Sequence, residues 1–171
     1  METIKAISKR KSVRSYKQNQ IPEEVLNIIL NAGCSAAVAS GKYETLHLTI
    51  VQDKRIIEKI SDAISKFLNK ENAMSYGAPT MIFVSSIEPH VPGIEFANAG
   101  TILQNMAIAA TDQGVDSVIM GGAAFAVRSN DELRKELGIP DGFNPVLNIV
   151  LGYAAIPDDT KQEHEISMNR V

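Results

Sequence analysis

Hydrophobic positions along the chain change period several times, and these changes divide the sequence into helices and strands. Apolar residues three and four positions apart are typical of amphipathic helices, whereas short apolar or alternating runs are typical of strands. The predicted helices cover residues 2–9, 22–33, 53–69, 94–113 and 130–137, and the predicted strands cover residues 46–52, 81–84, 115–120 and 146–152. This mixture predicts an α+β domain.

Several of these helices have clear signals at their ends. Pro22 suits a first helical position, and Gly33 is expected to end the helix that Pro22 opens. Asp53 is the expected N-cap of the helix over 53–69. Ser129 and Glu132 have the spacing of a capping box, which predicts the start of the last helix.

Two segments also predict which side chains are buried. In the strand over 46–52, Leu46, Leu48 and Ile50 alternate with polar residues and are expected to face the core. The helix over 94–113 is apolar nearly all round, so it must be buried on most of its sides. We expect a second subunit to cover one of those sides.

At the end of the chain, residues 166–171 alternate apolar and polar side chains, a pattern able to add a strand to a sheet, its own or a neighbour's.

Composition adds limits on where the protein works. The chain has 171 residues, 44% apolar and 22% charged, so we expect one folded domain over residues 1–171. The single cysteine, Cys34, cannot form an internal disulfide, which favours a cytoplasmic, reducing location. We expect Cys34 to be a small buried thiol beside a helix end. We expect no secretory signal, and no apolar run reaches the ~18 residues that a membrane helix needs, so no membrane partner is expected.

Charge is distributed unevenly along the chain. The net charge of −3 makes the protein as a whole a poor match for nucleic acid, and we expect no nucleic-acid partner. Near the N-terminus, however, cations gather without an intervening acid: Lys9, Arg10, Lys11, Arg14 and Lys17. Arg10, Ser12 and Arg14 can surround one phosphate, because arginine binds phosphate in a bidentate way and serine adds a neutral donor. A solvated basic face is the simpler alternative, and a docking strip for an acidic protein or RNA is another.

Other catalytic motifs are missing or weak. The sequence has no Gly-x-Ser-x-Gly elbow, and three scattered histidines with one cysteine exclude a zinc site of standard spacing. Residues 40–42 (SGK) lack the first glycine and the final hydroxyl of a phosphate loop. The pair Gly121–Gly122 is most simply a tight turn, although glycine is also what the close approach of a flat ligand would require.

A set of short motifs resembles one known family. The sequences KRKSVRSY at 9–16 and IPEEV at 21–25 resemble the N-terminal signature of the FMN-dependent nitroreductase family. Later segments are similar to that family in the same order: YGAPT at 76–80, NAGTILQNMAIAA at 98–110, LGIPDGF at 137–143 and LGY at 151–153. Residues 37–46 (AVASGKYETL) depart from the family's usual pattern there, which indicates a divergent branch with small subunits.

The resemblance implies a fold, an assembly and a cofactor. The fold would be a central mixed or antiparallel sheet flanked by helices, in a homodimer whose C-terminal tail extends onto the partner. Two FMN molecules would bind at the interface, with Arg10 and Ser12 on the phosphate and ribityl chain and Lys11 contributing its backbone. Arg14 would approach the N1/O2 edge of the flavin, and Gly121 and Gly122 would lie near N5. Ala37, Val38, Ala39 and Ser40 would come from the other subunit, and Arg170 would reach the phosphate.

The resemblance also implies an activity. NAD(P)H would reduce FMN and leave before a small electron-poor acceptor, such as a nitroaromatic or a quinone, binds in a ping-pong cycle. Because flavin carries out this chemistry itself, no catalytic side chain is expected. Two alternatives with the same fold remain open. One is a flavin-dependent dehalogenase or flavin-fragmenting enzyme, and the other is a flavin-binding module without turnover.

Overall fold

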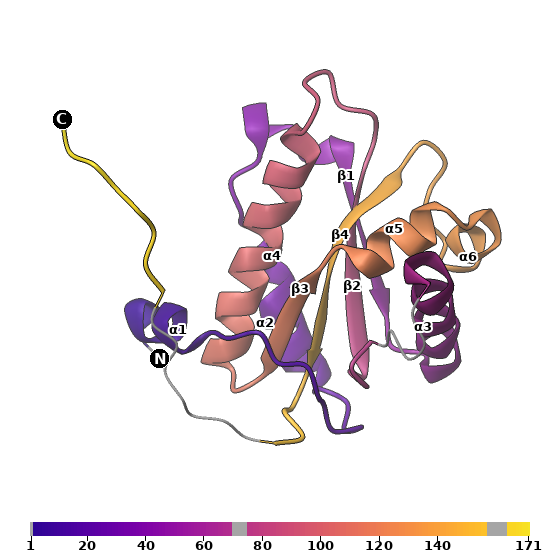
Figure 1. Ribbon diagram of the computed structural model, residues 1–171, viewed down its shortest axis with the longest axis horizontal. Helices are drawn as coiled ribbons and strands as arrows, with labels where there is room; N and C mark the ends of the chain where they lie inside the picture. Colours follow the sequence, from indigo (N-terminus) through magenta and orange to yellow (C-terminus); the bar gives the residue numbers. More distant parts are fainter. Residues whose placement is uncertain (1, 70–74, 157–163) are drawn as a thin grey trace.

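The computed structural model describes residues 2–69, 75–156 and 164–171 of the chain, and it has the predicted α+β architecture (Figure 1). Its strands are β1 (Leu46–Val51), β2 (Thr80–Ser86), β3 (Asp116–Met120) and β4 (Asn144–Gly152). Its helices are α1 (Thr3–Lys9), α2 (Glu23–Cys34), α3 (Lys54–Leu68), α4 (Ile94–Asp112), α5 (Gly122–Arg128) and α6 (Asp131–Glu136), and two short 3₁₀ turns are η1 (Ala39–Gly41) and η2 (Tyr43–Thr45).

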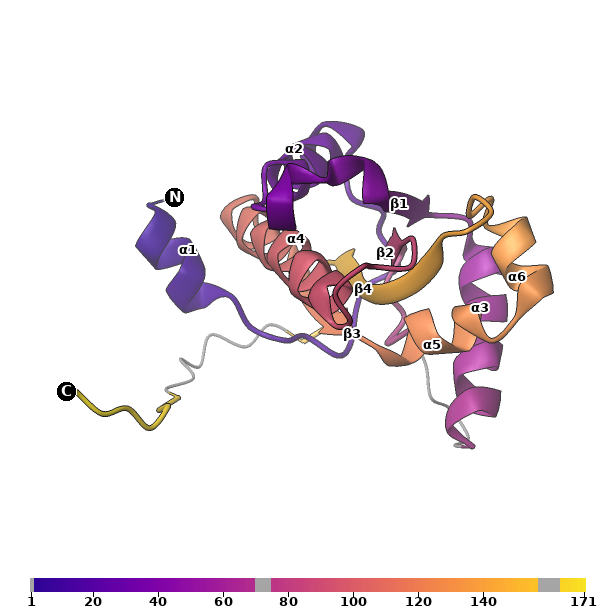
Figure 2. The same cartoon turned by 90° about the horizontal axis from the view of Figure 1, so that it is seen from above.

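The strands form one antiparallel sheet in the order β1-β2-β4-β3, so β1 and β3 are its edges. Helices cover both faces of this sheet, as Figure 2 shows from above. On one face, α2 and α4 pack through Ile29 and Leu103 against Ile149 of β4. On the other face, α3 and α5 pack through Ile60 and Val127. The sheet therefore has a hydrophobic core on each side, which confirms the predicted central sheet flanked by helices.

Helix α4 is buried along a broad face that includes Ile102, Leu103 and Met106. A stripe at helical spacing, formed by Ala97, Thr101 and Gln104, stays exposed on the single chain. The apolar character of this helix is therefore explained in part by the chain's own core. The expected second subunit over the remaining side stays a prediction.

Several local predictions were wrong, and each error has a physical reason. Helix α2 ends at Cys34, one residue past the predicted Gly33, and glycine is needed at 33 because a methyl group there would overlap the buried side chain of Met106. The last helix is capped by the Asn130 side chain, which accepts a hydrogen bond from Leu133 N at 3.0 Å, and Ser129 instead ends α5. That short helix, α5, had not been predicted.

Two burial predictions also need correction. Ile50 is 41% exposed, because it lies on the edge strand β1 beyond the reach of the helices that cover Leu46 and Leu48. Cys34 is exposed at the end of α2 rather than buried. Of the helices within residues 2–69, 75–156 and 164–171, none has the length and apolar character that crossing a membrane requires.

Candidate functional site

The cationic segment after α1 runs along the outer edge of the sheet. We call residues 10–17 the basic arm. Val13 N donates a hydrogen bond to Ser117 O at 3.0 Å, and Ser12 forms a parallel bridge with Ser117. Further along, Lys17 N donates to Tyr153 O at 2.8 Å. Because these contacts attach the arm to β3 and to the residues after β4, its backbone is ordered by the sheet rather than being a free surface strand.

Tyr16 anchors the basic arm from inside the protein. Its side chain is only 6% exposed, and its hydroxyl donates to Val13 O at 2.9 Å. Burial raises the pKa of the Tyr16 phenol, and the nearby carboxylate of Asp116 raises it further, so the hydroxyl remains a donor. The ring packs against Gly152, where an added methyl group would come within 3.1 Å of Tyr16 Cδ1.

The arm presents its charged groups outward. Arg10 and Lys11 are half-buried, whereas Ser12 and Arg14 are exposed. Arg14 Nη1 donates to Ser12 O at 3.4 Å, and no ion pair involves Arg10 or Arg14 among the described residues. The guanidinium groups of Arg10 and Arg14 and the hydroxyl of Ser12 are the kind of donors that a phosphate monoester requires. The chemistry of this donor set fits the phosphate of FMN.

The glycine pair lies at the other end of the same strand. Gly121 and Gly122 follow β3 directly, about 13 Å along the strand from Ser117. Both are half-buried, and neither has a positive φ angle, so the turn itself does not require glycine. A methyl group on Gly121 would instead come within 3.2 Å of Phe125 Cε2. Strand β3 thus carries the basic arm near its start and a half-buried glycine pair at its end.

The loop with Ala37, Val38, Ala39 and Ser40 lies elsewhere in the single chain. Ala39 N donates to Asn98 Oδ1 at 3.0 Å, and Thr101 Oγ1 donates to Ala37 O at 3.0 Å. These contacts hold the loop at the first half of α4, whereas the arm adjoins Ser117 of β3, which starts beside the last turn of that helix, where Val115 N donates to Ala110 O at 2.8 Å. The two are separated by roughly 20 Å along the helix axis. One chain alone does not bring the predicted loop to the predicted phosphate site.

Arg170 belongs to the C-terminal tail. It is exposed in the segment over 164–171, which extends away from the sheet in both Figure 1 and Figure 2. Within the described residues this tail forms no strand, and its apolar residues Ile166 and Met168 are more than four-fifths exposed. The expected pairing of the tail with a sheet therefore stays a prediction.

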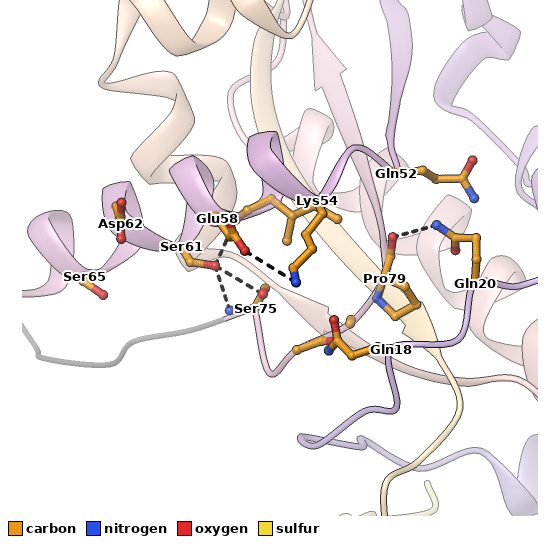
Figure 3. A pocket seen from close by; sticks show the side chains of 13 residues that line it. Gln18, Gln20, Gln52, Lys54, Glu58, Ser61, Asp62, Ser65, Ser75 and Pro79 are labelled. Carbon is orange, nitrogen blue, oxygen red and sulfur yellow. Dashed lines mark hydrogen bonds and ion pairs between the residues drawn. The ribbon is translucent and has the colours of Figure 1, made fainter.

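A pocket of about 800 Å³ lies at the end of the sheet near α3, lined mostly by polar side chains (Figure 3). It contains none of the predicted site residues. Gln18 Nε2 donates to Gly77 O at 3.0 Å, and Gln20 Nε2 donates to Pro79 O at 3.0 Å. These side chains tie the continuation of the basic arm to the turn before β2. The sequence contained no signal for this role, because an isolated glutamine has no characteristic pattern.

Comparison with known proteins gives consistent matches over most of the chain. The model of the nitroreductase family matches residues 7–76 and 66–153. A protein of Methanothermobacter thermautotrophicus, provisionally named an NADH dehydrogenase/NAD(P)H nitroreductase, is 30% identical over 91% of this chain and 78% of its own length. A protein of Archaeoglobus fulgidus with the same name is 30% identical over 96% of this chain and 90% of its own length.

Solved structures are similar as well. A nitroreductase with bound FMN from Desulfitobacterium hafniense has a TM-score of 0.86 and 24% identity, covering 100% of this chain and 99% of that chain. A nitroreductase with bound FMN from Bacteroides fragilis has a TM-score of 0.80 and 27% identity, covering 99% of this chain and 100% of that chain. These similarities extend along the whole fold, including the basic arm.

Proposed function

Because the chain belongs to the nitroreductase family, we propose that it is an FMN-dependent oxidoreductase that transfers reducing equivalents from NAD(P)H to electron-poor acceptors such as nitroaromatics or quinones. The observation that carries this proposal is the basic arm, which is hydrogen-bonded to the edge strand β3 and presents a phosphate-binding set of donors. The FMN-bound relatives with the same fold support the choice of cofactor.

In this proposal each group on the edge of the sheet has a role. Arg10 and Ser12 hold the phosphate and the ribityl chain, with help from the backbone of Lys11. Arg14 lies at the N1/O2 edge, where a cation favours the negative charge of reduced flavin. Gly121 and Gly122 offer backbone N–H groups near N5. Bound FMN supplies the hydride and electron chemistry. The chain itself binds the flavin, orients it and tunes its electronic properties.

The proposed site needs two copies of the chain. The loop over 37–40 is held about 20 Å from the basic arm along α4, so we assign it to the flavin of a partner subunit. The exposed stripe of α4 and the exposed apolar tail are surfaces that such a homodimer would cover. In the dimer, Arg170 of one chain would reach the phosphate held by the other. Each chain would act as one domain, in the cytoplasm, where a single cysteine stays reduced.

Substitution of the arm tests this assignment. The double variant Arg10→Ala/Arg14→Ala should bind FMN more weakly by about 2–5 kcal/mol, because it removes two charged partners of the phosphate and the ring. Lys17→Ala is the matched control, since Lys17 is an exposed cation of the same arm beyond the Tyr16 anchor. Equal FMN affinity in the double variant and the wild type would show that the flavin binds elsewhere.

The assembly is tested separately. Light scattering of the purified protein should give the mass of two chains with one FMN per chain. A monomer that binds FMN with full affinity would contradict the role assigned to the loop over 37–40.

A further inference from the structure

Aromatic surface is scarce in this protein, and part of it lies beside the glycine pair. The chain has no tryptophan and five phenylalanines. Phe96, in the first turn of α4, is 39% exposed, and its ring centroid lies 6.4 Å from that of Phe125 on α5. The planes are inclined by 43°, within the tilted arrangements that aromatic pairs prefer. We call Phe96 and Phe125 the aromatic wall.

One member of the aromatic wall, Phe125, borders Gly121 directly. The Phe125 ring edge is 3.2 Å from the position that a methyl group on Gly121 would take. On the neighbouring Gly122, a methyl group would be 3.7 Å from Leu68 Cδ1, and Leu68 is itself 43% exposed at the end of α3. Side chains from two helices, Phe125 of α5 and Leu68 of α3, and Leu147 of β4 therefore lie beside the half-buried glycine pair, and all of them are apolar.

This surface is continuous with the proposed flavin site. Gly121 follows β3, whose first half is bridged to the basic arm at Ser12. A flavin with its phosphate at the arm would therefore extend along β3 toward the glycine pair and the aromatic wall. The exposed ring of Phe96 and the half-buried ring of Phe125 offer a flat, uncharged contact for a second ring at that place.

We propose that Phe96 and Phe125 select the electron acceptor, by contacting planar aromatic acceptors beside Gly121. This inference rests on the proposed function, because it places the acceptor next to the flavin. It goes further in assigning the preference to two side chains that lie outside the motifs shared with the family. Small inorganic acceptors have no ring to contact the wall, so the wall does not increase their binding affinity.

Leucine substitutions test the wall while keeping it apolar. Phe96→Leu and Phe125→Leu remove the rings but retain most of the buried volume, so the fold should be kept. Phe143→Leu is the matched control, because Phe143 is a half-buried aromatic residue that contacts His47 at a centroid distance of 5.7 Å, away from the glycine pair. Phe96→Tyr should behave like the wild type, since it keeps an aromatic ring at this position.

The first readout is binding without turnover. Menadione, a planar quinone, is titrated into oxidised, FMN-loaded protein without NAD(P)H, and its dissociation constant is read from the change in flavin absorption. Each leucine variant of the wall should raise this constant by about two- to twelvefold, the range expected for one lost aromatic contact. The control variant and Phe96→Tyr should stay within twofold of the wild type.

The second readout separates the wall from the flavin itself. With ferricyanide, of which two ions accept the two electrons of each NAD(P)H, the wall variants should react at the wild-type rate, and their FMN affinity should be unchanged. If wild-type protein binds no FMN, the proposed function fails. If FMN binding is normal but the wall variants bind menadione as tightly as the control does, or lose ferricyanide activity to the same degree, the inference is overturned.

Discussion

Gly152, at the end of β4, is the position where the smallest possible substitution should disturb the proposed site. A methyl group there would lie 2.7 Å from Pro79 Cδ and 3.1 Å from Tyr16 Cδ1. The Pro79 ring is bonded to its own backbone and cannot rotate away, so the chain before β2 must move. Overpacking of this kind costs about 1–3 kcal/mol. Gly152→Ala should therefore lower Tm by roughly 2–12 °C, at ~2–4 °C for each kcal/mol in a chain of this size.

The same substitution should also weaken FMN binding, because Tyr16 holds the basic arm through its bond to Val13 O. Thermal unfolding followed by circular dichroism gives the stability, and flavin titration gives the affinity. Pro79→Ala removes the overlapping Cδ atom. In a double-mutant cycle, Gly152→Ala and Pro79→Ala should therefore couple favourably by about 0.5–3 kcal/mol. An unchanged Tm in Gly152→Ala would refute the packing described here.

Three further predictions concern individual residues. Asn130→Ala should destabilise the protein by about 0.5–2 kcal/mol in denaturant unfolding, because it removes the cap of α6. Ser129→Ala should leave the stability unchanged. An equal loss of stability in the two variants would show that Ser129 also caps the helix. The Arg55 guanidinium lowers the pKa of the Asp53 carboxyl from 3.8 to about 2. The contribution of the ionised Asp53 carboxylate to stability is therefore complete above pH 3.8 and is lost as the pH falls toward 2. In Arg55→Ala the backbone N–H groups still donate to Asp53, so an NMR titration should find its pKa raised from about 2 but still below its ordinary value, and a pKa still near 2 would contradict the role of the guanidinium. Cys34 should react with a maleimide in the folded protein, as mass spectrometry would detect, and a thiol that reacts only after unfolding would contradict its exposure.

Periodicity predicted the regular elements well, because each long element buries one face. The Asp53 cap and the helix that follows it are examples, since the apolar spacing and the capping side chain agree. Helix α5 was not predicted, because a helix of seven residues, GAAFAVR, is too short to establish a period and is largely buried between α3 and the sheet. Gly33 was wrongly predicted to end its helix for a different reason. Glycine is required there by contact with Met106, which is far away in the sequence, so the local sequence does not reveal it.

The candidate site was predictable only in part. The cluster of cations was visible in the sequence, but its attachment to Ser117 and the burial of Tyr16 come from tertiary contacts. Likewise, sequence order could not reveal that the loop over 37–40 is held near one end of α4 and the arm near the other. The glutamines that tie the arm to the turn at Gly77 and Pro79 were missed for the same reason.

The most direct test compares two ligands that differ only in the phosphate. FMN and riboflavin are titrated separately into the same flavin-free protein, and their dissociation constants are compared. If the arm at Arg10–Arg14 grips the phosphate, FMN should bind at least about tenfold more tightly than riboflavin, since charge-assisted hydrogen bonds contribute about 1.5–3 kcal/mol each. Equal affinity for the two ligands, or binding of neither, would contradict the account.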